Sequence, residues 1–223
     1  MLRVALVYPE LLGTYGDGGN ALVLVERARR RGLEATQLPV ALDTPLPEAD
    51  IYLLGGGEDG PQRHATEALR RDGTLGKRIE DGAVLFAVCA GLQIVGVSFE
   101  VEGGEMYDGL ALVDLTTRRD TSRRVGELRC GVGTNELVGF ENHGGVSALG
   151  NAAALGTVRR GFGNDGLVDG CRAPRLVGTY AHGPVLALNP WLADELLGEA
   201  VGHALEPLVT VADQLYDARR RAR

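Results

Sequence analysis

The segment Gly82–Gln93, with the sequence GAVLFAVCAGLQ, decides the fold of this chain. Its apolar run from Ala83 to Val88 is short, uninterrupted and preceded by glycine, a pattern typical of a strand buried on both faces of a parallel sheet. Small residues and a helical pattern follow Cys89 directly, so we predict a tight strand-to-helix turn with this cysteine at its apex. The N terminus of the following helix favours a thiolate there. Cys89 is therefore a candidate nucleophile, and a buried structural cysteine is the alternative.

The overall composition is that of an ordinary globular protein. The chain has 223 residues, of which 44% are hydrophobic and 24% charged, and its net charge is −7. This acidic balance gives no support to nucleic-acid binding. The N-terminal residues have the pattern of a strand rather than of a signal peptide, and no apolar stretch approaches the ~18 residues of a membrane span. We expect one cytoplasmic domain over residues 1–223, without a transmembrane segment.

The cysteine count gives a further constraint. Cys89, Cys130 and Cys171 are an odd number and lack CxxC spacing. This pattern argues against a disulfide framework and against a zinc ribbon. It is consistent with a reducing compartment, in which thiols stay free. We expect no bound metal.

Apolar runs that alternate with helical patterns predict an α/β fold. The first half reads as β-α-β-β-α-β-α, the order of a three-layer, open and mostly parallel sheet with helices on both faces. After Gly103 the pattern changes to short strand candidates, which we expect to form antiparallel hairpins that extend the sheet or build a small antiparallel layer. The expected early elements are strands Leu2–Tyr8, Leu33–Leu38, Asp50–Leu54 and Ala83–Val88, and helices Ala21–Arg31, Gln62–Asp81 with an interruption near Gly73, and Ala90–Val97. The expected later elements are strands Leu110–Leu115, Val125–Cys130, Glu136–Phe140, Leu155–Val158, Gly166–Val168 and Leu176–Tyr180, a helix Trp191–Leu205 and an amphipathic tail Val209–Arg223, whose Arg219–Arg221 run is expected to be a solvated, frayed end.

Two glycine-rich segments follow expected strands. Gly55–Gly57 at the end of Asp50–Leu54 presents backbone N–H groups at the edge where ligands of open α/β sheets bind. Gly13–Asn20 follows the first strand, a position that suggests binding of nucleotide phosphates, but it lacks both GxGxxG and the lysine of a phosphate-binding loop. A turn or helix cap formed by Asp17 or Asn20 is the simpler interpretation.

A thiol nucleophile needs a base within hydrogen-bond reach, and the chain has four histidines. His182 ends the expected strand Leu176–Tyr180 and precedes Gly-Pro, which stops that strand. His143 lies in an expected turn. His64 and His203 lie on expected helices among charged residues, and we interpret them as surface residues. The residues alone favour His182 over His143 only modestly, and a loop histidine without a catalytic role is the alternative for both.

These segments together resemble a known family. The glycine-rich loop, Cys89 within Ala87–Gly91 and a histidine at a strand end are similar in order and spacing to class I glutamine amidotransferases. Gly139–Gly145 (GFENHGG) and Thr179–Pro184 (TYAHGP) resemble the cobyric-acid-synthase-like branch. They are most similar to the GatD-type glutaminase subunits of lipid II isoglutaminyl synthases. The resemblance covers roughly residues 2–205 and implies the flavodoxin-like fold of that family.

The resemblance implies hydrolysis of L-glutamine to L-glutamate and ammonia. Cys89 would attack the side-chain amide carbon, and His182 would move the protons. Backbone N–H groups of Gly56 or Gly57 and of Ala90 would hold the tetrahedral oxyanion.

The same resemblance implies the residues that recognise the substrate. Arg123 matches the arginine expected to bind the α-carboxylate of glutamine, and Arg124 replaces it if the local alignment slips by one residue. Asn142 and His143 are further expected substrate contacts. Without the resemblance, the two arginines would be interpreted as an ordinary solvated pair.

Two positions depart from the pattern of the larger family. Ala87 stands where Gly-x-Cys-x-Gly has its first glycine, which leaves less room at the turn. Pro184 stands where the usual triad has a glutamate, two residues after the histidine. The branch lacks that glutamate too and implies a Cys–His dyad completed by an acidic residue of a partner subunit. We therefore expect a weak glutaminase alone and a better one in a complex.

The resemblance implies a heterodimer with a Mur-ligase-like (MurT) subunit. That partner would use ATP to activate the D-glutamate α-carboxyl of lipid II and amidate it to isoglutamine, in the peptidoglycan synthesis that builds the cell wall and sets cell shape. This chain has no ATP motif, so no cofactor is expected on it. Three alternatives stay open: an amidotransferase subunit for another acid such as a corrinoid, a cysteine hydrolase of the same fold, and a non-catalytic scaffold.

Overall fold

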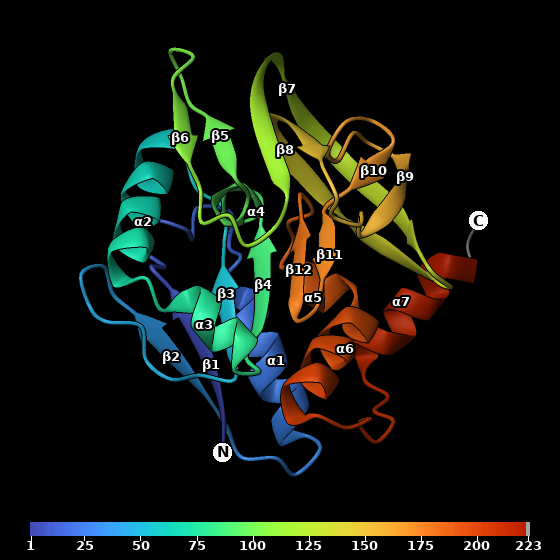
Figure 1. Ribbon diagram of the computed structural model, residues 1–223. Coiled ribbons are helices and arrows are strands. Elements are labelled where there is room, and N and C mark those ends of the chain that lie inside the picture. The colour runs from blue at the N-terminus through green and yellow to red at the C-terminus, as the bar shows by residue number, and fades with distance from the viewer. Residues whose placement is uncertain (222–223) are drawn as a thin grey trace.

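The computed structural model describes residues 1–221 and has an α/β architecture built around a six-stranded sheet (Figure 1). The strand order is β11-β12-β4-β3-β1-β2, and all neighbours are parallel except β11, which pairs antiparallel with β12. The bounds are β1 Leu2–Val7, β2 Ala35–Val40, β3 Ile51–Leu54, β4 Val84–Val88, β11 Cys171–Ala173 and β12 Leu176–Thr179. The predicted mostly parallel sheet is therefore confirmed.

Strand β4 lies in the interior of this sheet, between β3 and β12. All five of its residues are buried, as its uninterrupted apolar run predicts. Strand β2 is an edge strand, and its more polar sequence agrees with partial exposure. It begins two residues later than predicted, because the loop after the first helix continues through Glu34.

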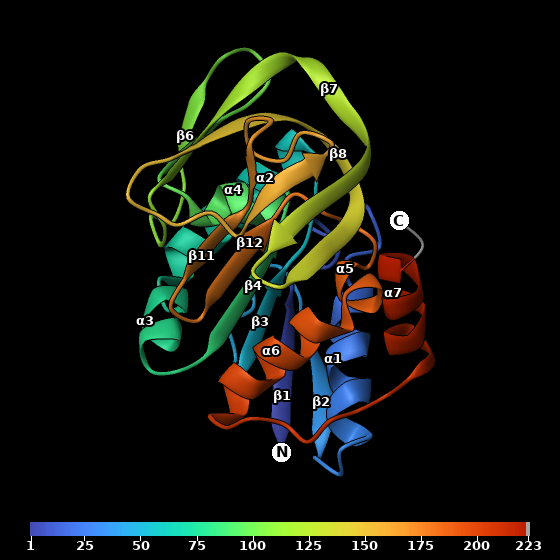
Figure 2. The same ribbon diagram turned by 90° about the vertical axis from the view of Figure 1, so that its right-hand side faces the viewer.

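Helices cover both faces of the first sheet. The chain moves from β1 to β2 in one direction across the sheet and from β3 to β4 in the other. Since parallel crossovers are right-handed, α1 lies on one face and α2 and α3 lie on the opposite face (Figures 1 and 2). The bounds are α1 Gly19–Arg29, α2 Asp59–Asp72, α3 Leu75–Glu80, α4 Ala90–Val95, α5 Val185–Leu188, α6 Pro190–Val201 and α7 Val211–Arg221.

A second, largely antiparallel sheet lies beside the carboxyl ends of the first (Figure 2). Its centre is a long hairpin of β7 and β8, and its order is β10-β9-β7-β5-β6 with β8 paired to β7. The bounds are β5 Ser98–Glu100, β6 Met106–Asp108, β7 Leu115–Val132, β8 Asn135–Leu149, β9 Gly156–Arg160 and β10 Val168–Asp169. The predicted antiparallel hairpins are present and form a sheet of their own, but the predicted strands Val125–Cys130 and Glu136–Phe140 are only parts of two much longer strands.

The predicted strand Leu110–Leu115 is wrong, because β7 begins only at Leu115. Leu110 and Leu112 instead donate backbone hydrogen bonds to the carbonyls of Ile94 and Val95. The segment therefore satisfies the orphan carbonyl groups at the C-terminal end of α4 rather than joining a sheet.

The C-terminal helix α7 packs beside α6 and α5 (Figure 2). It is helical through Arg221, whereas a frayed end was predicted, and Arg219 and Arg221 are exposed, as predicted. The last two residues of the predicted tail, 222–223, lie outside the described residues. Among residues 1–221, no helix is both long and apolar enough to cross a bilayer.

Candidate active site

Four candidate catalytic segments meet at one edge of the first sheet. Strands β1, β3, β4 and β12 are parallel, so their carboxyl ends lie together. The loops after these strands carry Asp17, Gly55–Gly57, Cys89 and His182, respectively. The strand order reverses between β1 and β3, which is the position where open α/β sheets form their ligand crevice.

Cys89 occupies the turn between β4 and α4 in a strained backbone conformation. Its φ is 51° and its ψ is −103°, values rare for a residue with a side chain. Such strain, together with a thiol at the N-cap of a helix, is the geometry of a nucleophile elbow. Gly91 permits the tight turn, since a Cβ there would stand 2.6 Å from the carbonyl oxygen of Leu54.

His182 is fully buried beside Cys89 and is held by a carboxylate of the same chain. Its Nδ1 lies 2.9 Å from Oδ2 and 3.2 Å from Oδ1 of Asp17, which is itself 2% exposed. Its Nε2 is buried and makes no hydrogen bond among the described residues. With Nδ1 donating to Asp17, Nε2 is the atom available to exchange a proton with the thiol.

The electrostatics of this group favour a charged imidazole. Burial alone would lower the pKa of His182, but Asp17 and Cys89 outweigh it and raise the pKa to about 10. Protonated His182 beside Cys89 favours an imidazolium–thiolate pair, which is the reactive form of a cysteine nucleophile.

Asp17 is a carboxylate that the sequence does not assign to the site. The sequence predicts that the acidic member comes from a partner subunit, and within this chain the carboxylate that contacts His182 is that of Asp17, in the loop after β1. Asp17 was interpreted as a turn or cap residue, because its neighbours Gly16 and Gly18 give a turn pattern and nothing local relates it to His182. A signal for its role was its position after a buried parallel strand next to β3 in the sheet.

The two glycines proposed for the oxyanion differ in what they bind. The N–H of Gly56 donates to Oδ2 of Asp17 at 2.9 Å. The N–H groups of Gly57 and Ala90 donate no hydrogen bond among the described residues, and both residues line the same pocket as Cys89. Gly57 and Ala90 are therefore the better pair of donors for an oxyanion.

A cavity of about 470 Å³ opens in front of Cys89. Arg123 lies at its edge with half of its side chain exposed. Its Nε donates to Oδ1 of Asn142 at 2.6 Å, and its Nη2 donates to the hydroxyl of Tyr15 at 2.8 Å. These contacts hold a cation at the mouth of the pocket that contains the nucleophile.

A bulge in the long hairpin places Arg123 there. The pairing of β7 with β8 is regular up to Arg119 opposite Gly145 and resumes at Arg124 opposite His143. Four residues of β7, 120–123, therefore lie opposite a single residue of β8, Gly144. Bulges of this kind redirect side chains next to active sites.

Arg124, the alternative carboxylate ligand, is directed elsewhere. Its guanidinium stacks on the ring of Phe162 at 4.1 Å and pairs with Asp120, and Arg124 does not line the cavity. Of the two arginines, the geometry favours Arg123 as the substrate ligand.

Asn142 and His143 both line the cavity but differ in what they can offer. Asn142 positions Arg123 directly. The Nδ1 of His143 contacts the carbonyl of Gly145 at 3.0 Å, and its Nε2 lies 3.3 Å from Oε2 of Glu141. Because both ring nitrogens are engaged within the protein, His143 is better placed to fix the pocket wall than to bind substrate.

Gln93 is a pocket residue that the sequence interpretation missed. It follows Cys89 by four residues, and both residues line the same pocket. Its Nε2 donates to the hydroxyl of Tyr180 at 3.1 Å, and its Oε1 accepts from Nε2 of Gln62 at 2.9 Å. The spacing of four residues on a helix was the available signal.

The two other cysteines are unsuited to act as nucleophiles. All three are free thiols. Burial raises the pKa of Cys130 far above its usual value and that of Cys171 to about 12, so neither forms a thiolate readily. Within residues 1–221 no cluster of three metal-binding side chains is found.

The comparisons with known proteins identify the family and the fold. The model of the CobB/CobQ-like glutamine amidotransferase domain matches residues 3–190, so the chain belongs to that family. A solved structure described as a glutamine amidotransferase superposes with a TM-score of 0.56 at 20% identity, over 89% of this chain and 98% of the other, which shows the shared fold.

Two curated relatives mark different branches of the family. The chain is 34% identical to the GatD subunit of lipid II isoglutaminyl synthase (glutamine-hydrolyzing) from Staphylococcus aureus, over 85% of this chain and 80% of the relative. It is also 34% identical to cobyrinate a,c-diamide synthase from Halobacterium salinarum, over 70% of this chain but only 38% of that protein.

Proposed function

We propose that this chain is a glutaminase subunit of the GatD type, which hydrolyses L-glutamine to L-glutamate and ammonia. The observation that carries the proposal is the buried series Asp17–His182–Cys89 at the base of a pocket whose mouth holds Arg123. A nucleophile, a base and an orienting carboxylate in this arrangement suit acyl transfer.

The first half of the reaction forms a thioester. The Cys89 thiolate attacks the side-chain amide carbon, and the oxygen that becomes negative is held by the N–H groups of Gly57 and Ala90. The bond to nitrogen then breaks, and His182 gives its proton to the departing ammonia. Asp17 keeps the imidazole oriented and stabilises its charge throughout.

The second half returns the enzyme to its starting state. His182 is now neutral and takes a proton from water, which attacks the thioester carbon. The tetrahedral intermediate collapses, glutamate leaves, and Cys89 regains its thiolate. Each proton lost by His182 is thus recovered within one turnover.

The ammonia would pass to an ATP-dependent, Mur-ligase-like partner of the MurT type in a heterodimer. That partner would amidate the D-glutamate α-carboxyl of lipid II to isoglutamine in the cytoplasm. The match over four fifths of the GatD relative supports this acceptor. The corrinoid alternative has weaker support, because the chain corresponds to little more than a third of the cobyrinate synthase.

The test is glutamine-dependent ammonia release by the purified chain, alone and with a co-expressed Mur-ligase-like partner. Cys89→Ser is expected to lower kcat by on the order of 10⁶-fold, as for other nucleophiles of catalytic triads. Cys171→Ser is the matched control, because its thiol lies away from the pocket. A folded chain that releases no ammonia in either setting would reject the proposal and favour a scaffold.

A further inference from the structure

Two side chains of opposite charge lie against each other at the mouth of the active-site pocket. Nη2 of Arg123 stands 3.6 Å from Oε1 of Glu58, the residue directly after the Gly55–Gly57 loop. The two come from different sheets, one from the bulge in β7 and the other from the loop after β3. The pocket therefore presents a cation and an anion side by side.

Tyr15 joins this pair and connects it to the catalytic histidine. Its hydroxyl donates to Oε1 of Glu58 at 2.6 Å and accepts from Nη2 of Arg123 at 2.8 Å. Burial and the hydrogen bond to Glu58 raise the pKa of Tyr15 to about 12, so the phenol stays protonated and can donate. Its ring lies 4.7 Å from that of His182.

Each charged group keeps one atom without a partner. Nη1 of Arg123 and Oε2 of Glu58 make no hydrogen bond or ion pair among the described residues, whereas the other polar atoms of both groups are engaged. One free donor and one free acceptor thus remain on adjacent groups that line the pocket of Cys89.

The other acidic side chains around the pocket do not offer this pairing. Asp59 is bound to Arg119, Asp120 to Arg124 and Glu100 to Arg118, and Glu102 contacts no arginine among the described residues. Among the described residues that line the cavity, Glu58 is the carboxylate that contacts Arg123.

We propose that Glu58 binds the α-ammonium group of the substrate while Arg123 binds its α-carboxylate, so that the pair selects a zwitterionic amino acid over a simple amide. An α-amino acid carries both charges on one carbon, which matches a cation and an anion only a few ångströms apart. The inference rests on the proposed glutaminase function. It adds the group that recognises the amine and explains why a carboxylate follows the glycine loop.

The test measures binding by calorimetry in a Cys89→Ala background, where turnover does not interfere. Two ligands are compared: L-glutamine, and 5-amino-5-oxopentanoate, which keeps the carboxylate and the amide but lacks the ammonium group. Glu58→Gln keeps the shape of the side chain and removes its charge. Glu67→Gln, an exposed carboxylate on α2 outside the pocket, is the matched control.

Glu58→Gln is expected to raise the Kd for L-glutamine by about 10- to 100-fold, the loss of one hydrogen bond to a charged group. The Kd for 5-amino-5-oxopentanoate is expected to stay unchanged, and Glu67→Gln to alter neither. Equal weakening of both ligands would overturn the inference, because Glu58 would then act only by holding Tyr15 and Arg123. No effect on either ligand would overturn it too. If the Cys89→Ala chain binds no glutamine at all and the wild type releases no ammonia, the proposed function itself fails.

Discussion

The edge of the parallel sheet and the bulge of the long hairpin contribute to the same pocket in different ways. At the sheet edge, Cys89, His182 and Asp17 are at most 5% exposed and come from loops that directly follow buried strands. At the bulge, the side chain of Arg123 is 49% exposed, and its contacts are with polar side chains.

The difference separates chemistry from recognition. Bond making needs groups fixed to fractions of an ångström, and packed strands provide that rigidity. Charge recognition tolerates small displacements, so a bulged strand beside solvent is sufficient. Substitutions at the sheet edge should therefore act mainly on kcat, and substitutions at the bulge mainly on KM.

Among the substitutions that test this comparison, and after that of the nucleophile itself, the largest effect is expected from Asp17→Asn. A harmless Asp17→Asn would contradict the assignment of chemistry to the sheet edge. Loss of the carboxylate misorients His182 and removes its stabilising charge, so kcat should fall on the order of 10³- to 10⁴-fold. The alkaline limb of the kcat profile should also move to lower pH, since the pKa of His182 is raised partly by Asp17. Glu10→Gln, in the same loop but exposed, is the control. An unchanged kcat would indicate that a residue of a partner subunit, and not Asp17, orients His182.

The next effect is expected from Gly56→Ala. An added Cβ would stand 2.6 Å from Cε1 of His182 and 3.1 Å from Oδ2 of Asp17, so the imidazole must move. Displacement of the catalytic imidazole from its productive position is expected to lower kcat by about 100-fold. Gly60→Ala is the matched control, because a Cβ at Gly60 meets no atom within 4 Å. Equal rates for the two variants in the ammonia assay would show that the sheet edge is less rigid than we infer.

A smaller effect, in KM rather than kcat, is expected from Arg123→Gln. Loss of the ion pair with the α-carboxylate should raise KM for glutamine by about 10- to 100-fold. Arg124→Gln should leave KM nearly unchanged, since that guanidinium contacts Phe162 and Asp120. Steady-state kinetics of the two variants would decide between the arginines, and the opposite ranking would reject the assignment of Arg123.

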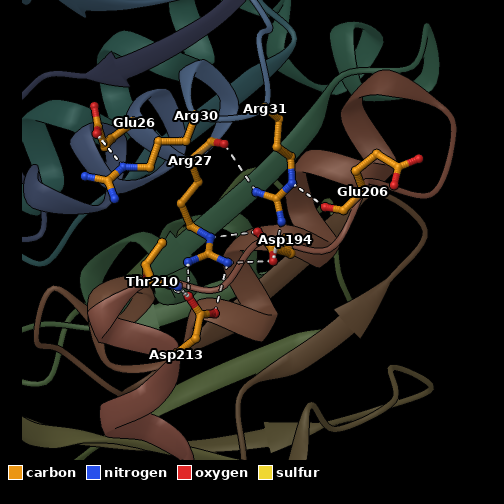
Figure 3. A network of polar contacts seen from close by, with 8 residues as sticks. All are labelled: Glu26, Arg27, Arg30, Arg31, Asp194, Glu206, Thr210 and Asp213. Carbon is orange, nitrogen blue, oxygen red and sulfur yellow. Dashed lines mark hydrogen bonds and ion pairs between the residues drawn. The ribbon is translucent and has the colours of Figure 1, made fainter.

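The smallest effect on catalysis is expected from Arg27→Gln, although it should change stability. Figure 3 shows Arg27 of α1 between Asp194 of α6 and Asp213 of α7, at 2.7–3.1 Å from both carboxylates. Its side chain is 5% exposed, so removing the charge should cost about 3 kcal/mol of unfolding free energy. Arg30→Gln, which loses only an exposed pair with Glu26, should cost about 0.5 kcal/mol or less.

Denaturant midpoints for these two variants would check the difference, with KM for glutamine expected to stay constant in both.

Burial opposes the charge of Asp213, but Arg27 and Thr210 outweigh it and lower the pKa of the carboxyl. The stabilisation by this ion pair is therefore present at neutral pH and lost as the pH falls below about 4. Equal denaturant midpoints of the two variants at pH 7 would show that the ion pairs of Arg27 with Asp194 and Asp213 add nothing to stability.

The sequence predicted the parts of the molecule that depend on local pattern. The buried strand before Cys89 and the strand that ends before His182 both follow from short apolar runs, and their parallel pairing brings the two residues to one edge. Asp17 could not be assigned in the same way, because its partner is 165 positions away in the chain and its glycine neighbours indicate only a turn.

The long hairpin was underestimated for a related reason. The central part of β7, Arg118–Arg124, is almost entirely polar, and a polar run of this kind is typical of a loop. It belongs to a strand because β7 pairs with β8 on both sides of the bulge, and that pairing is a tertiary effect. The bulge that directs Arg123 into the pocket depends on the register between the strands, which no local pattern reveals.

The central claim is that Asp17 of this chain, and not a residue of a partner, orients and charges His182. NMR titration of the imidazole signals of His182 tests it directly, in the isolated chain and without substrate. In the wild type, His182 is expected to stay protonated through neutral pH and to titrate near pH 10. In Asp17→Asn the titration should move to clearly lower pH. A His182 that titrates near 6.5 in both proteins would contradict the account.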